Sequence, residues 1–173
     1  MTTNGGGSAG ALLGIMGLLN GAKASYPSYN TFNKCLSSSV LGIDVDLDGD
    51  FDEDDVKEAE KFKALNVGVL TSSYAFSCGN LLPCLLKEAG YKIIGERTGG
   101  GSCSIKLEST ADGLVYVHSS FDCMATNKGE NVDSGVEPDF EISVYGEDGN
   151  YDMSKFFDFA YIAEYLSSAY DNE

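Results

Sequence analysis

The stretch VGVLTSSYAFSCGNLLPCLLKEAGYKIIGERTGGG (67–101) decides the fold class of this chain. An apolar segment at 67–71 is typical of a buried strand, and a second such segment follows at 91–96. Between them a leucine-rich helix is expected from about Asn80 to Ala89, with Pro83 in its first turn and Gly90 ending it. Strands that alternate with helices predict an α/β fold with a mixed sheet.

The segments on either side fit the same single domain, residues 1–173. Ser8 can cap a helix that runs to about Leu19, whereas residues 22–43 have no clear period and are expected to form a loop. Paired strands at 103–109 and 114–119 are expected around a turn at 111–113, with a further strand at 136–144. A terminal helix is expected over 154–168, with one apolar side formed by Phe156, Phe157, Ala160, Ala163 and Leu166.

Composition and charge exclude some classes of function. Apolar residues make up 43% of the chain, and no apolar run is long enough to span a bilayer. The net charge of −16 argues against nucleic acid as a partner. Ten of the 27 acidic residues lie at 44–60, so much of the negative charge belongs to one segment rather than to a generally acidic surface.

Five cysteines, Cys35, Cys78, Cys84, Cys103 and Cys123, lack the paired spacing of a zinc site. The odd number leaves at least one of them free. Buried free thiols behave as small apolar groups, which is the default interpretation here. A disulfide and the redox compartment stay open at this point.

Residues 44–55 (DVDLDGDFDEDD) fit the twelve-residue calcium-binding loop. Carboxylates stand at positions 1, 3, 5 and 12, and glycine stands at position 6 for the sharp turn. The expected ligands are Asp44, Asp46, Asp48, the carbonyl of Asp50, and Asp55, with a water under Asp52. Because Asp replaces the usual final Glu, the loop resembles dockerin-type loops. We therefore expect a structural Ca²⁺ in an insert at 44–65, which ends in a helix; the alternative is a solvated acidic loop.

Ser77 stands at the turn between the first strand and its helix, where an α/β enzyme can expose a nucleophile. Phe76 is expected to face the core. The N–H of Cys78 and a glycine amide of Asn4-Gly5-Gly6-Gly7 can together form an oxyanion hole. The plainer alternative is that Ser77 caps a helix and the glycines form a turn.

The order of four motifs, NGGG (4–7), FSCGNLLP (76–83), IIGERTGGG (93–101) and GVEPD (135–139), resembles the S41 family of serine peptidases. The family includes the C-terminal processing proteases and their tricorn-like relatives. The resemblance covers residues 1–20 and about 64–142. It implies a ClpP/crotonase-like ββα core, Ser77 as nucleophile, and Gly5 and Gly6 as the glycine pair beside it.

The general base differs between the two branches of the family. The Ser–Lys branch carries a lysine in a G-E-K-T-x-G-K motif, but this chain has glycine there and Asn80 in place of that branch's glutamate, which leaves Lys106 as the nearest substitute. The tricorn-like branch uses a histidine before the serine, oriented by a glutamate that corresponds to Glu130. His118 follows Ser77 and is expected to be structural.

The family's NGGG follows a buried strand, whereas only Met1-Thr2-Thr3 precede Asn4. We therefore expect the histidine to lie in a missing N-terminal part of the same protein. The expected function is a serine endopeptidase that acts through an acyl-enzyme on peptide or protein substrates, outside the cell or in its envelope. The alternative is an inactive S41-like or calcium-stabilised module that binds a protein or peptide. The serine at the turn argues against a third reading, a crotonase-like acyl-CoA enzyme.

Overall fold

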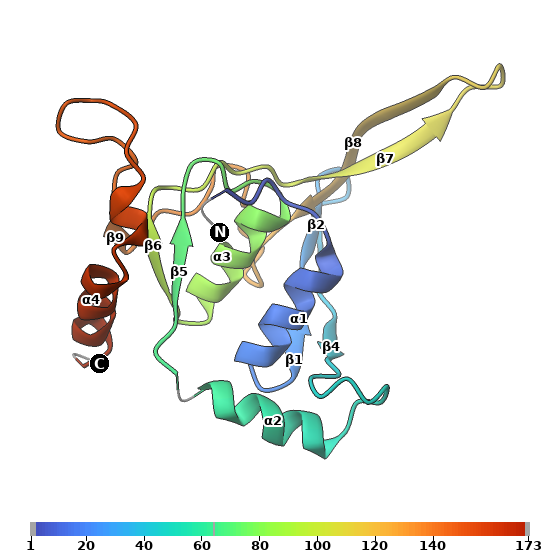
Figure 1. The fold of residues 1–173 in the computed structure, drawn as a ribbon. Coiled ribbons are helices and arrows are strands. Elements are labelled where there is room, and N and C mark those ends of the chain that lie inside the picture. Colours follow the sequence, from blue (N-terminus) through green and yellow to red (C-terminus); the bar gives the residue numbers. More distant parts are fainter. Residues whose placement is uncertain (1–2, 64, 172–173) are drawn as a thin grey trace.

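The computed structural model describes residues 3–63 and 65–171, and its α/β fold confirms the predicted class (Figure 1). At the centre lies a three-stranded parallel sheet with the order β5 (Gly68–Thr71), β6 (Lys92–Gly95) and β9 (Phe140–Glu141). Helix α3 (Cys78–Glu88) connects β5 to β6, as predicted from residues 67–101. It packs on one face of the sheet, and helix α4 (Phe159–Asp171) lies on the other.

Alternate residues of the central strands pack against the two faces. Val69 and Ile93 are paired across β5 and β6, and they pack in the core formed with α3. Leu70 and Ile94 form the next pair and pack in a second core around Phe156. Both faces of this sheet are covered, which explains why the sequences of β5 and β6 are largely apolar instead of alternating.

The region 22–43, predicted to be a loop, contains four short strands, so that prediction is wrong. β1 (Lys23–Ser25) pairs with β4 (Val40–Gly42), and β2 (Ser28–Asn30) pairs with β3 (Cys35–Ser37). β2 also pairs with the distant strand β8 (Val115–Met124). Strands of three residues are too short for a periodic pattern, and the pairing of β2 with β8 depends on a remote part of the chain.

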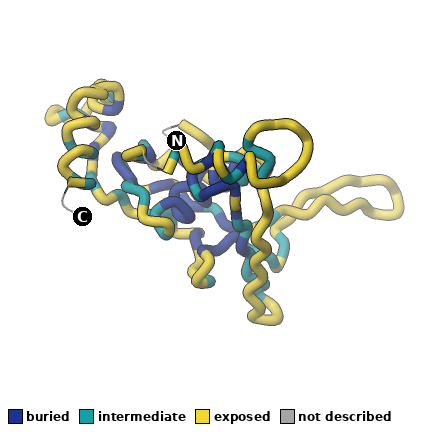
Figure 2. The backbone as a smooth tube through the Cα atoms, turned by 90° about the horizontal axis from the view of Figure 1, so that it is seen from below, coloured by how far each residue is buried: buried dark blue, intermediate teal, exposed yellow. Residues whose placement is uncertain are grey.

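The predicted hairpin is present and forms an arm that projects from the body (Figure 1). β7 (Cys103–Ser109) pairs with β8 in an antiparallel sheet of order β3-β2-β8-β7. β8 is longer than the predicted 114–119, because its end continues into the pairing with β2. Most of the arm is exposed, whereas α3 is buried (Figure 2).

The two helices predicted before residue 65 are present. α1 (Ala9–Leu19) starts after Ser8, whose hydroxyl accepts from the N–H of Ala11, and its buried residues include Leu12 and Met16. α2 (Glu53–Lys63) follows the acidic loop. Within the described residues, none of the helices combines the length and apolar character needed to cross a bilayer.

Three further predicted boundaries are wrong. α3 begins directly after Ser77, so Pro83 lies inside the helix rather than in its first turn. The strand expected at 136–144 is reduced to β9, because the carbonyls at its two ends, Val136 and Val144, accept from Thr98 and Asp152 instead of from β6. The terminal helix is interrupted at Asp158 into a 3-10 turn, η1 (Ser154–Phe157), and α4, and Phe157 is exposed.

Candidate active site

Ser77 occupies a strained turn between the sheet and α3. Its backbone has φ 56° and ψ −123°, which lies outside the regions that side chains adopt freely. Its N–H donates to the carbonyl of Gly100 at 3.0 Å, and its carbonyl accepts from the N–H groups of Asn80 and Leu81 at 2.9 and 2.8 Å. Such a conformation costs about 1–3 kcal/mol and persists only where the surroundings impose it. The turn therefore presents the half-buried Ser77 at the N-terminus of α3.

The glycine loop at residues 4–7 lies directly against this turn, as predicted. The carbonyl of Asn4 accepts from the N–H of Phe76 at 3.0 Å. A Cβ on Gly6 would lie 2.7 Å from the Cβ of Ser77, and one on Gly79 would lie 2.2 Å from the Asn4 carbonyl oxygen. Side chains at these positions would push the two segments apart, so glycine is required for their close approach.

Phe76 does not face the core as expected. It is 50% exposed, and its ring covers Gly101, where a Cβ would lie 2.4 Å from the ring. Phe76 forms an isolated bridge with Gly100 and therefore belongs to the surface beside the nucleophile turn. β5 ends at Thr71, five residues before Phe76, so strand alternation does not set the direction of this side chain.

The start of α3 and the glycine loop offer backbone amides to an oxyanion near Ser77. Within residues 3–63 and 65–171, the N–H groups of Cys78, Gly5 and Gly7 have no hydrogen-bond acceptor. The first N–H groups of a helix are unpaired within the helix and favour negative charge. The N–H of Gly6 instead donates to Oδ1 of Asn4 at 2.9 Å. Of the two glycines predicted, the geometry thus favours Gly5 as the second donor, and Gly6 provides the close contact.

A small cavity of about 190 Å³ opens between the glycine loop, α1 and the start of α3. Its wall includes Cys78 together with the apolar side chains of Ala11, Leu12, Ile15 and Leu82. The volume is below the roughly 300–1,000 Å³ of typical small-molecule pockets, so it suits a single side chain rather than a cofactor.

Asn80 connects α3 to the two downstream motifs. Its side chain is fully buried and donates to the carbonyl of Val132 at 2.7 Å, and it accepts from the hydroxyl of Thr98 at 2.5 Å. The same Thr98 hydroxyl accepts from the N–H of Val136 at 2.7 Å. The sequence showed Asn80 only as a departure from the Ser–Lys branch; its supporting role depends on residues that are remote in the chain.

The GVEPD motif fixes the end of α3 against β6. The carboxylate of Asp139 accepts from the N–H of Ile93 at 2.8 Å and pairs with Lys87 at 3.0 Å. Lys87 also donates to the carbonyl of Glu137 at 2.7 Å. This motif therefore has a structural role that the sequence analysis did not assign.

In the part of the chain that the structure describes, the two candidate bases lie on the arm rather than beside Ser77. His118 and Lys106 face each other across β8 and β7 on the projecting arm, and His118 lies 3.3 Å from Glu108 (Figure 1). In the described part of the chain, Ser77 Oγ has no hydrogen-bonding side chain. Glu130 is exposed and lines a separate cavity of about 310 Å³ whose wall does not include Ser77. Its role in orienting a histidine stays a prediction.

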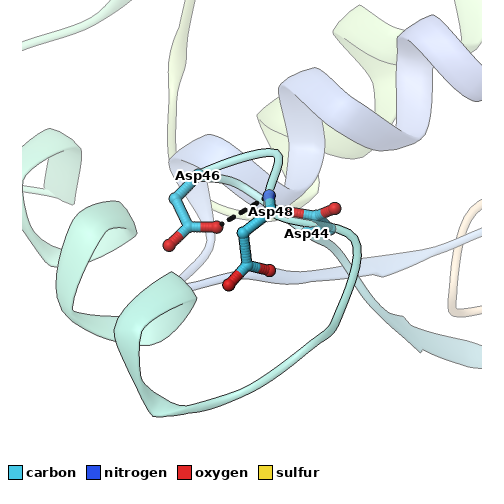
Figure 3. Close-up of side chains that lie close together, drawn as sticks. All are labelled: Asp44, Asp46 and Asp48. Atoms are coloured by element: carbon cyan, nitrogen blue, oxygen red, sulfur yellow. Dashed lines mark hydrogen bonds between the residues drawn. The ribbon is translucent and has the colours of Figure 1, made fainter.

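Three acidic side chains of the predicted calcium loop converge (Figure 3). One carboxylate oxygen from each of Asp44, Asp46 and Asp48 lies within 4.8 Å of the others. Both oxygens of Asp44 accept backbone N–H groups, from Leu47 and Gly49, which closes the turn. Partial desolvation and the neighbouring carboxylates raise the pKa of Asp46. Clustered oxygens of this kind are the donors that Ca²⁺ prefers, so the group fits a hard cation.

The other predicted ligands lie outside this group. Asp55 is buried at the start of α2, and its carboxylate accepts the N–H groups of Val45, Asp46 and Asp52. These backbone hydrogen bonds lower the pKa of Asp55. Asp50 donates its N–H to Asp48 at 3.0 Å. In this structure Asp55 therefore holds the loop closed, and ligation by Asp50 and Asp55 stays a prediction.

Solved structures with the same fold include several proteases. A candidate peptidase from Parabacteroides merdae is 21% identical with a TM-score of 0.60, over 86% of this chain and 45% of its own. The photosystem II D1 C-terminal processing protease is 20% identical with a TM-score of 0.61, over 82% of this chain and 33% of its own. A candidate S41 protease from Bacteroides fragilis is 19% identical with a TM-score of 0.51, over 83% of this chain and 36% of its own.

This chain thus spans less than half the length of those structures. A search of curated proteins finds no match. The sequence profile of peptidase family S41 matches residues 1–142, which include the glycine loop, Ser77 and the GVEPD motif. The chain belongs to peptidase family S41.

Proposed function

We propose that this chain carries the nucleophile and oxyanion hole of a serine endopeptidase. The observation that carries the proposal is the strained turn at Ser77, with the N-terminus of α3 on one side and the glycine loop on the other. A helix cap does not require a positive φ, and Ser77 makes no side-chain capping bond to α3. The plainer reading of Ser77 as a cap is therefore disfavoured.

In the proposed reaction, Ser77 Oγ attacks the carbonyl carbon of a peptide bond and loses its proton to a base. The oxygen of the tetrahedral intermediate accepts from the N–H groups of Cys78 and Gly5. Collapse expels the amine, which takes up the proton, and water then hydrolyses the acyl-enzyme. Each oxyanion donor contributes about 10²–10³ in rate.

The base is proposed to come from a residue outside this sequence. His118 and Lys106 lie on the arm, and a hydroxyl without a nearby base is a poor nucleophile at neutral pH. Glu130 is kept as the residue that would orient a histidine of the tricorn-like type. The chain alone is therefore expected to react slowly.

Covalent labelling with a fluorophosphonate tests the nucleophile. Attack by Ser77 Oγ on phosphorus expels fluoride and leaves a stable ester, which peptide mass spectrometry can locate. Ser77→Ala should lose the adduct, whereas Ser73→Ala, an exposed serine of the same loop, should retain it. An adduct that persists in Ser77→Ala would refute the assignment.

A second candidate function is a peptide-binding module without catalysis. The observation that favours it is the lack of a base near Ser77 among the described residues. This candidate predicts that peptides bind in calorimetric titration and that Ser77 forms no adduct even when an external base is added.

We further propose that the acidic loop binds one structural Ca²⁺ through Asp44, Asp46 and Asp48, with Asp50 and Asp55 completing the set. The support is the convergence of the three carboxylates in the acidic loop. Millimolar calcium outside the cell would fill such a site, which favours an extracellular or envelope location.

A further inference from the structure

Cys103 and Cys123 are paired on β7 and β8 at the base of the arm, next to a register shift between Cys103 and Ile105. The N–H of Met124 donates to the carbonyl of Ser102 at 2.6 Å. These two residues flank the cysteine pair, one on each strand. In an antiparallel ladder this pattern marks a non-hydrogen-bonded pair, whose Cα atoms are about 4.5 Å apart and whose side chains share one face.

This arrangement meets the requirements of a disulfide. Bridged cysteines have Cα atoms about 4.4–6.8 Å apart, and the two Cβ atoms must point toward the same side. The Cys103 sulfur already lies over β8, because it accepts from the hydroxyl of Ser119 at 3.5 Å. Both thiols are free in this structure; Cys103 is exposed and Cys123 is half-buried. Because the backbone register already pairs the two residues, the bond requires the two sulfurs to turn toward each other.

The remaining cysteines are poorly placed for this bond. Cys35 lies on β3 opposite Asn30, and β2 separates β3 from β8. Cys84 is buried in α3, where desolvation raises the pKa of its thiol to about 12. Cys78 stands beside the nucleophile at the start of α3. Of the five, Cys103 and Cys123 are the pair that the register brings face to face.

We propose that Cys103 and Cys123 form a reversible cross-strand disulfide by exchange with a small-molecule disulfide. The thiolate of one cysteine attacks a sulfur of the reagent and releases one reagent thiol. The second cysteine then attacks the mixed disulfide and releases the other. The two cysteines lose two protons and two electrons in total, and the reagent is reduced to two thiols.

The bond would cross-link the two strands of the arm next to the segment that supports Ser77. Ser102, next to Cys103, donates its N–H and its hydroxyl to the carboxylate of Asp133 at 3.0 and 3.2 Å. Two residues earlier, the carbonyl of Gly100 accepts the N–H of Ser77. The bond would also close a loop of 19 intervening residues, which restricts the unfolded chain and should raise the melting temperature.

The test uses the full chain treated at pH 8 with oxidised glutathione and then alkylated without reduction. Trypsin cuts after Arg97, Lys106 and Lys128, so Cys103 and Cys123 fall on the separate peptides 98–106 and 107–128. A disulfide joins these peptides into one species that reduction splits. We expect this species to predominate, with free thiols falling from the five of the sequence to three.

Cys103→Ser and Cys123→Ser should each lose the linked species and the rise in melting temperature, whereas Cys35→Ser should keep both. Lone glutathione adducts on Cys103 or Cys123, a link from either to another cysteine, or five thiols that stay titratable would each overturn the proposal. Mapping on the unsubstituted chain decides the question even if a variant fails to fold.

Discussion

The nucleophile turn and the acidic loop are both short motifs, but the chain holds them in opposite ways. At the turn, Ser77 bonds to Gly100, and Asn80 bonds to Val132, 52 residues away. In the acidic loop, every carboxylate bond to the backbone joins residues ten or fewer positions apart. The turn therefore depends on the whole fold, whereas the loop depends chiefly on its own residues.

The largest expected loss of stability comes from a substitution at Gly100, where the backbone that supports the turn passes close to the backbone of Asp133. In Gly100→Ala, at φ +82°, the new Cβ would lie 1.9 Å from the carbonyl oxygen of Asp133. Strain and this clash together should lower the free energy of unfolding by about 4 kcal/mol. Urea denaturation measures the change.

Gly113→Ala is the matched control for this prediction. Gly113 has φ +89° in the arm's turn, but no atom lies within 4 Å of its added Cβ. It should lose only about 1–2 kcal/mol, from backbone strain. Equal losses of unfolding free energy in the two variants would mean that the close approach of Gly100 to Asp133 does not stabilise the turn.

The buried amide of the turn should produce the next largest effect. Asn80→Ala leaves the carbonyl of Val132 and the hydroxyl of Thr98 without their partner. We expect a loss of about 1–3 kcal/mol in the free energy of unfolding, since unsatisfied buried polar groups cost that much. Asn150→Ala is the exposed control, because its side-chain amide donates to Asp148, two residues away. A loss no greater than that of the control would show that the network does not stabilise α3.

The acidic loop should respond to calcium rather than to remote substitutions. Ca²⁺ that binds only the folded chain should raise its melting temperature by several degrees at about 100 times the dissociation constant. Asp48→Ala should abolish most of this shift, because it removes one of the three converging carboxylates. Asp112→Ala removes the same charge from the arm's turn and should keep the shift. A melting temperature that is unaffected by millimolar calcium, with no heat in calorimetric titration, would show that the acidic loop does not bind Ca²⁺.

The smallest effect is expected on the polar face of the arm. The hydroxyl of Tyr116 and the ring of His118 hydrogen-bond to Glu108 and lower the pKa of this carboxyl. All three groups are exposed, so solvent screens the interaction. Glu108→Gln should leave the melting temperature unchanged within error at pH 7. A clear decrease would mean that this pair stabilises the arm.

The same contrast explains what the sequence could predict. The helix after Ser8, the strand–helix–strand unit at 67–101 and the acidic loop depend on local patterns, and the structure contains them. The meeting of residues 4–7 with Ser77 followed from the family resemblance rather than from periodicity. Two features depend on pairing between remote segments, which leaves no local pattern. They are the strand β2, which pairs with β8, and the hydrogen bond from Ile93 to Asp139.

The rate at which a fluorophosphonate modifies Ser77, measured against imidazole concentration, tests the central claim most directly. If the turn presents a nucleophile that lacks only a base, the unassisted chain should react slowly, and the rate should rise in proportion to added imidazole. Fast modification without imidazole that His118→Ala or Lys106→Ala abolishes would contradict the external base. No adduct at Ser77 at any imidazole concentration would contradict its assignment as the nucleophile.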